Sequence, residues 1–110
     1  MEFVYICSPY KSANPKIVDR NVFQAFVYCR LAYDAGYFPI APHCYLPKFI
    51  DDGDKNERKK ALQLGLKALK KCSEIWVFGE RITEGMRGEI KFAKENKIKI
   101  RYFTRQGEED

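Results

Sequence analysis

The sequence predicts an α/β fold, a three-layer flavodoxin-like or Rossmann-like arrangement in which a parallel sheet of about four strands carries helices on both faces. Short segments rich in β-branched and aromatic residues alternate along the chain with longer segments whose apolar residues recur at helical spacing. Strands that alternate with helices imply right-handed crossovers, which make neighbouring strands parallel. We expect the strand order 2-1-3-4.

The first strand and the first helix are predicted in the N-terminal third of the chain. Residues 3–7 form an apolar run that ends at Ser8-Pro9-Tyr10. A helix is expected over residues 15–35, because proline suits its first turn and Gly36 ends it. The apolar stripe of this helix is predicted to consist of Val18, Val22, Ala25, Phe26, Cys29, Ala32 and Tyr33.

The middle of the chain is predicted to hold a short strand, a long loop and a second helix. The strand covers residues 38–41 and ends at Pro42-His43, and the loop covers residues 45–54. Asp54 and Glu57 have the spacing of a capping box, so a helix is expected after them. The apolar face of that helix is predicted to carry Leu62, Gly65, Leu66 and Leu69.

Residues 72–96 form the segment around which the chain is organised. The run IWVF at residues 75–78 is predicted to be a strand covered on both faces, and Gly79 stops it. Thr83 is expected to cap a helix that begins near Glu84. The apolar face of that helix is predicted to consist of Met86, Ile90 and Ala93.

The C-terminal part and the domain organisation follow from the remaining pattern. Residues 98–103 alternate basic and apolar side chains, as a half-exposed edge strand does, and the tail QGEED is expected to be frayed. No internal repeat or linker interrupts the chain. We therefore expect one domain over residues 1–110, a length that buries about two-thirds of the unfolded surface.

Composition and charge argue against several classes of function. Twenty basic residues exceed fifteen acidic ones, but no helix joins clustered basic residues to a groove-reading motif, so nucleic-acid binding is not expected. The four cysteines lack CxxC spacing, which predicts buried thiols in a reducing compartment and neither a metal nor a cofactor. The start MEFVYICSPY lacks a basic n-region, and no stretch approaches about 18 uncharged apolar residues, so we expect a cytoplasmic protein without a membrane partner.

A ligand site is expected at the carboxyl edge of the sheet. In open sheets of this type ligands bind at the switch point, here between the first and third strands. Three loop segments meet there: Ser8-Pro9-Tyr10, Pro42-His43 and residues 79–89. Glu89, Tyr10 and His43 are therefore predicted to lie near one pocket.

Each of these positions also has a simpler interpretation. Glu89 would be a surface glutamate on a helix, and His43 would satisfy local hydrogen bonds at a strand end. Ser8 and Tyr10 would shape a turn. Gly85 and Gly88 would serve either tight packing of the helix against the sheet or contacts from backbone N–H groups to a phosphate.

Several stretches of the chain together resemble a known superfamily. They are VYICSPY, Asn21 with Ala25 on the first helix, PIAPH, CSEIWVFG and GMRGEIKFA. These stretches are similar to a small uncharacterised branch, a domain of unknown function, of the nucleoside 2-deoxyribosyltransferase-like superfamily. The resemblance covers nearly the whole chain, and it implies that fold and a nucleoside or nucleotide ligand.

The resemblance also implies a reaction and a site. In the transferases, a glutamate preceded by a glycine-containing turn attacks the anomeric carbon, and Glu89 is the matching position. This implies cleavage of an N-glycosidic bond or deoxyribosyl transfer with Glu89 as nucleophile, and the alternative is a non-catalytic nucleotide-binding or sensing domain. The predicted ligand-binding residues are Ser8, Pro9, Tyr10, His43, Gly79, Gly85, Met86 and Gly88.

The sequence departs from the transferase pattern at the second carboxylate, which serves the leaving base. The corresponding stretch, LGL at residues 64–66, contains no acid. Retaining glycosyl chemistry uses a nucleophile and an acid/base group about 5 Å apart. The candidates for this second group are Asp51, Asp52, Glu84 and His43.

Self-association is expected from the first helix. Phe23, Tyr28 and Leu31 lie off its main stripe, which gives more exposed apolar surface than a monomer usually keeps in one patch. A homo-oligomer, most simply a two-fold dimer, would cover them.

Overall fold

The computed structural model describes residues 2–110, and within this range the sheet has four strands. They are β1 (Phe3–Cys7), β2 (Phe38–Ile40), β3 (Glu74–Phe78) and β4 (Lys99–Phe103). The strands are parallel and their order is β2-β1-β3-β4. This confirms the predicted fold class and strand order, and it places the carboxyl ends of β1 and β3 side by side.

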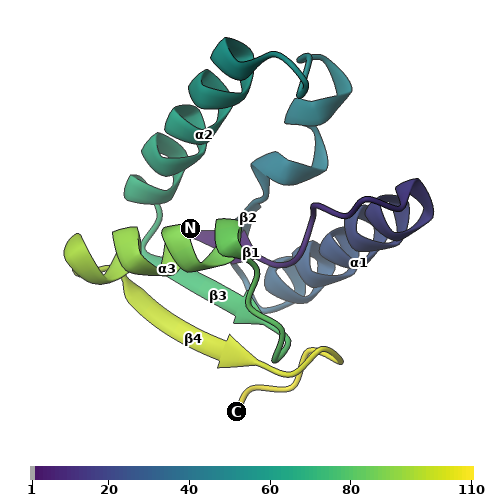
Figure 1. Cartoon of the computed structure of the whole chain (residues 1–110). Helices are drawn as coiled ribbons and strands as arrows, with labels where there is room; N and C mark the ends of the chain where they lie inside the picture. The colour runs from purple at the N-terminus through teal and green to yellow at the C-terminus, as the bar shows by residue number, and fades with distance from the viewer. Residues whose placement is uncertain (1) are drawn as a thin grey trace.

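The helices cover both faces of the sheet (Figure 1). They are α1 (Pro15–Asp34), α2 (Lys55–Lys70) and α3 (Glu84–Glu95), and two 3-10 turns, η1 (Pro42–Cys44) and η2 (Leu46–Lys48), stand where only a loop was predicted. α1 packs on the face that carries Val4 and Ile6. α3 and the end of α2 pack on the opposite face, which carries Tyr5 and Cys7. Among residues 2–110, no helix has the length and apolar character needed to cross a membrane.

The inward face of α1 differs from the predicted stripe. Tyr28 is buried and stacks on Phe78, with ring centroids 3.9 Å apart, whereas Phe26 and Tyr33 are 55% and 64% exposed. Ala25, three residues before Tyr28, is small enough to let α1 approach the sheet, and the Tyr28 hydroxyl donates a hydrogen bond to the Arg105 carbonyl (2.8 Å). Ala25 and Ala32 of the predicted stripe are buried, so the prediction is correct for them, but it wrongly included Phe26 and Tyr33 and left out Tyr28. Apolar residues nearly encircle α1, so helical spacing alone does not fix the edges of the buried arc.

The C-terminal tail is ordered, contrary to the expectation that it frays. The Arg101 guanidinium donates to both carboxylate oxygens of Glu109, at 2.7 and 2.8 Å, and to the buried Glu74 at 3.1 Å. Glu109 also forms a β-bridge with Phe103. A basic residue on the edge strand therefore holds the tail against β4 through paired charge-assisted hydrogen bonds.

α2 stands away from the sheet, together with the segment that contains η1 and η2 (Figure 1). Of its predicted apolar face, only Leu69 is buried, whereas Leu62 is 57% exposed. Asp54 caps the helix, since its carboxylate accepts hydrogen bonds from the N–H groups of Asn56 and Glu57. The apolar face of α2 thus borders open space over much of its length.

Candidate functional site

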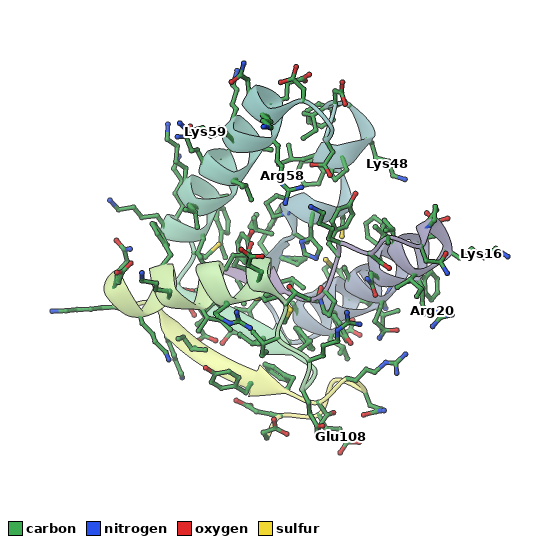
Figure 2. The ribbon with its side chains drawn as sticks, in the orientation of Figure 1. Lys16, Arg20, Lys48, Arg58, Lys59 and Glu108 are labelled. Atoms are coloured by element: carbon green, nitrogen blue, oxygen red, sulfur yellow. The ribbon has the colours of Figure 1, made fainter. Side chains whose placement is uncertain are left out.

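A cavity of about 820 Å³ occupies the space between α2, α3 and the η1–η2 segment. It lies beyond the carboxyl end of β1, at the predicted edge of the sheet. Figure 2 shows Arg58 directed from α2 toward the η1–η2 side, whereas its neighbour Lys59 points outward. The predicted site residues that line this cavity are Ser8, Tyr10, His43, Asp52, Glu84, Gly85, Met86, Gly88 and Glu89.

Glu89 is held beneath this cavity by a side chain of the sheet. The hydroxyl of Tyr5, in the middle of β1, donates a hydrogen bond to Oε2 of Glu89 across 2.5 Å. Tyr5 is only 2% exposed, whereas Glu89 is partly open to the cavity that both residues line. Thr83 begins α3 by accepting a hydrogen bond from the N–H of Met86, as its predicted capping role requires. β1 and α3 together therefore fix the Glu89 carboxyl in the wall of the cavity.

The environment of Glu89 favours its protonated form. Burial raises the pKa of Glu89 to about 7, and the hydrogen bond from Tyr5 opposes that increase. The N-terminus of α3 does little to favour the ionised form, because Glu89 lies in the second turn of the helix, where the helix dipole has already weakened. The carboxyl therefore titrates near neutral pH.

Ser8 and His43 form a second polar pair in the same cavity. The Oγ of Ser8 lies 3.0 Å from Nε2 of His43, and Ser8 is buried at the end of β1. Burial lowers the pKa of His43 to about 4, so the imidazole is neutral at pH 7. His43 can consequently position a ligand through hydrogen bonds, but it is a poor source of a proton for a leaving group.

The part of α2 from Ala61 onward gives the cavity an apolar side. A methyl group added at Gly65 would lie 3.6 Å from the hydroxyl of Tyr5, so Gly65 directly faces the Tyr5–Glu89 pair. Ala61, Leu62 and Leu66 also border the cavity here, and Arg58, one turn earlier, is the charged residue of α2 that lines it. The stretch in which the transferase resemblance places a second carboxylate thus borders the cavity without supplying one.

Gly85 and Gly88 face open space. A methyl group at either position would meet no atom within 4 Å, so the interpretation that they permit tight helix packing is wrong. Thr83 already occupies the N–H of Met86, and Gly88 lies in the second turn, where helix geometry pairs its N–H. The N–H groups open to an anion are those of Glu84 and Gly85.

Of the three carboxyl candidates for the acid/base group, two line the cavity and one does not. Asp52 lines the cavity and lies 3.9 Å from Arg58. Glu84 lines it at the start of α3. Asp51 does not line it, and its carboxylate accepts a hydrogen bond from the N–H of Gly53 at 3.0 Å. Within residues 2–110, no three His, Cys, Asp or Glu side chains are grouped so as to hold a metal ion.

Pro9 and Gly79 do not line the cavity that contains Glu89. They border a second hollow on the α1 side of the sheet edge. Gly79 has a φ of 90°, a conformation that favours glycine, and its N–H donates to the Phe103 carbonyl at 2.9 Å. Gly79 therefore extends the pairing of β3 with β4 by one hydrogen bond and borders the α1 side of the sheet edge, and it does not line the cavity that contains Glu89.

Sequence reasoning missed Tyr5 as a site residue. Residues 3–7 were interpreted as a core strand, and a tyrosine in such a strand fits a core position. A usable signal was present nonetheless, because a buried tyrosine hydroxyl requires a hydrogen-bond partner. The cavity also includes basic side chains that carried no motif, namely Lys11, Arg58 and Arg81.

A carboxyl group in the wall of a cavity at the switch point of a parallel sheet makes this a candidate small-molecule site in a protein of the α/β class. Residues 2–103 match the family described as "Domain of unknown function (DUF7768)", and the chain belongs to this family. Among solved structures, the chain is similar to a 2-deoxyribosyltransferase from the psychrotolerant bacterium Bacillus psychrosaccharolyticus, with a TM-score of 0.68 and 16% identity. The similarity covers 92% of this chain and 71% of the transferase. No curated protein matches the chain by sequence. The chain is thus a domain of unknown function with a nucleoside deoxyribosyltransferase-like fold, as the sequence resemblance implied.

Proposed function

We propose that this protein cleaves or exchanges the N-glycosidic bond of a nucleoside or nucleotide, with Glu89 as the nucleophile. The observation that carries the proposal is the Glu89 carboxyl, which Tyr5 holds in the wall of the 820 Å³ cavity. A cavity of this size accommodates a small-molecule ligand such as a nucleoside. The fold shared with a 2-deoxyribosyltransferase supports the same class of substrate.

The reaction begins with ionised Glu89. One carboxylate oxygen forms a bond to the anomeric carbon while the bond from that carbon to the base nitrogen breaks, and its electron pair leaves with the base. Burial raises the pKa of Tyr5 well above its usual range, so its hydroxyl keeps the proton that it donates to Glu89. Water, or a second base in a transfer reaction, then displaces Glu89 from the glycosyl-enzyme ester and regenerates the carboxylate.

The departing base needs a proton. Asp52 and Glu84 are the carboxyl candidates that line the cavity, and His43 is neutral at pH 7 because burial lowers its pKa. The base therefore takes its proton from solvent, or from Asp52 or Glu84 when that carboxyl is protonated as the base leaves. The N–H groups of Glu84 and Gly85 are available for a 5′-phosphate if the substrate carries one.

A second function is favoured by the apolar stretch of α2 that faces Glu89 across the cavity. Gly65 faces the Tyr5–Glu89 pair where the transferase pattern has an acid, and its neighbours in the cavity are Leu62 and Leu66. A site with a nucleophile but no paired acid would bind its ligand without turning it over. The alternative is therefore a nucleotide-binding or sensing domain with the same ligand class.

Replacement of Glu89 by Gln separates these two functions. Glu89→Gln keeps the size of the side chain and can still accept the Tyr5 hydrogen bond, so ligand affinity should change little, while base release should fall at least about a thousandfold. The matched control is Glu95→Gln, an exposed glutamate of the same helix outside the cavity. Base release by Glu89→Gln at the wild-type rate excludes the nucleophilic mechanism. Wild-type protein that binds nucleosides or nucleotides but releases no base supports the sensing function.

We also propose that the protein forms a homodimer through α1. Phe23, Phe26 and Tyr33 are each more than half exposed along one side of this helix. Tyr28, which the sequence argument assigned to this surface, belongs to the core instead. A second copy of the chain would remove the three exposed rings from water.

A further inference from the structure

The second hollow, about 580 Å³ in volume, lies on the α1 side of the sheet edge and is absent from the mechanism above. We propose that it binds the phosphate groups of an anionic ligand, and we call it the arginine hollow after Arg20, Arg81 and Arg105, which line it. The proposal concerns binding alone and does not depend on cleavage by Glu89.

The charge of the arginine hollow is unbalanced. Its three arginines come from α1, from the connection between β3 and α3, and from the segment after β4, and the carboxylate in its lining is that of Glu80. Among residues 2–110, none of these three arginines has a carboxylate oxygen within 4.0 Å. Arg20 projects from the N-terminal half of α1 (Figure 2). Guanidinium groups present planar, paired donors that match the geometry of phosphate oxygens, and here they are free to do so.

The wall of the arginine hollow is held in place by buried groups. Tyr28 stacks on Phe78 beneath it and donates a hydrogen bond to the Arg105 carbonyl at 2.8 Å. The segment after β4 is closed by hydrogen bonds to Thr104, from the N–H groups of Gly107 and Glu108. Arg105 therefore extends from an ordered turn, and less ordering of the chain is required when an anion binds.

Ser8 and Arg81 border both hollows. This arrangement allows two sources of phosphate with the same chemistry. A nucleotide whose sugar lies beside Glu89 could extend its own phosphate past Ser8 to the arginines, or a separate phosphate-bearing ligand could bind there. Competition between ligands distinguishes the two sources.

Inorganic pyrophosphate is the direct probe, titrated calorimetrically at low ionic strength. The wild type should bind it, and Arg20→Gln/Arg105→Gln should bind it at least about tenfold more weakly, since two guanidinium groups that form charge-assisted hydrogen bonds to phosphate are removed. The matched control, Arg30→Gln/Arg87→Gln, removes two arginines that line neither hollow. An equal loss in the control, or no loss in the first variant, overturns the proposal.

Amide NMR of the wild type tests the location without relying on a variant that must fold. Pyrophosphate should shift the amide resonances of Gly79, Thr104 and Gln106. Shifts confined to Glu84 and Gly85 would place the anion at the start of α3 and overturn the proposal, as would the absence of any binding at millimolar pyrophosphate.

Two competition outcomes identify the source of the phosphate, and each supports the site. Displacement of pyrophosphate by a nucleoside 5′-monophosphate, but not by its nucleoside, assigns the site to the substrate's own phosphate. Simultaneous binding of both assigns it to a separate anion. Glu89→Gln should bind pyrophosphate like the wild type, so a failure of the nucleophile and a failure of the arginine hollow are separate results.

Discussion

Tyr5 and Glu89 are 84 positions apart in the sequence and share a hydrogen bond at the carboxyl edge of the sheet. The bond joins a buried position of the central strand β1 to the second turn of α3. It opposes the effect of burial on the Glu89 carboxyl, so the pKa of Glu89 rises to about 7 and not further. Two properties of the protein should therefore depend on pH through this one group.

The first property is stability, tested with Glu89→Gln. The pKa of Glu89 rises from an ordinary value of 4.5 to about 7 in the folded protein. Between these values the folded state keeps a proton that the unfolded chain releases, so the carboxyl increasingly destabilises the fold as pH rises, by about 1.4 kcal/mol for each pH unit. Glutamine lacks this titration. Glu89→Gln should match the wild type below pH 4.5 and exceed its unfolding free energy by up to about 3 kcal/mol above pH 7.

Urea unfolding at pH 4.5 and pH 8 measures this difference. Glu95→Gln, which changes an exposed carboxyl on the same helix, should show no comparable dependence on pH. A constant offset between Glu89→Gln and the wild type at both pH values would show that burial does not raise the pKa of Glu89.

The second property is the pH profile of base release. The nucleophile must be ionised, so kcat/KM should increase as pH rises and reach half its maximum near pH 7. In Tyr5→Phe the hydrogen bond that lowers the Glu89 pKa is lost, so the midpoint should move to higher pH. Tyr45→Phe, an exposed tyrosine outside the cavity, is the control. A profile that falls with rising pH would assign Glu89 the role of a general acid.

The fold was predictable because each element carried its own local pattern. The IWVF run of β3 is buried at every position, and β4 has the exposed pattern of an edge strand. The edges of the inward arc of α1 were not predictable, because Tyr28 and Phe26 are both large aromatic residues, and the stacking of Tyr28 on Phe78 and its hydrogen bond to the Arg105 carbonyl appear only in the fold. The tail was wrongly predicted to fray. It is held by hydrogen bonds from Arg101 to Glu109, and the spacing of residues in the sequence does not reveal this contact.

The candidate site was predictable in location but not in chemistry. Parallel topology alone brings Tyr10, His43 and Glu89 to one cavity. The chemistry depends on the fold, because burial raises the pKa of Glu89 and its hydrogen bond to Tyr5 joins residues far apart in the sequence. Gly79 was assigned to the same pocket because it follows β3, but it borders the hollow on the α1 side of the sheet edge. Which side of the sheet edge a residue after a strand faces depends on backbone geometry that the pattern of strands and helices does not specify.

Gly88→Ala tests whether Gly88 serves ligand approach. Alanine in a helix interior is favoured over glycine by about 0.5–1 kcal/mol, and a methyl group at Gly88 meets no atom within 4 Å, so the melting temperature should increase. The same methyl group borders the cavity and should weaken nucleotide binding. Gly65→Ala is the comparison, since its methyl group reaches ordinary contact distance, 3.6 Å, from the Tyr5 hydroxyl on the opposite side. A lower melting temperature for Gly88→Ala would show instead that Gly88 is needed for packing of the helix.

The last prediction concerns the exposed face of α1. Phe23 is 68% and Phe26 is 55% exposed, so replacing both with glutamine removes apolar surface without opening the core. Sedimentation at micromolar concentration should show a dimer for the wild type and a monomer for Phe23→Gln/Phe26→Gln, with equal melting temperatures for the isolated chains. Phe49, in the loop before α2, is 69% exposed but lies on a different surface, so Phe49→Gln should leave the dimer intact. A monomeric wild type, or a dimer that survives the double substitution, would show that α1 is not the interface.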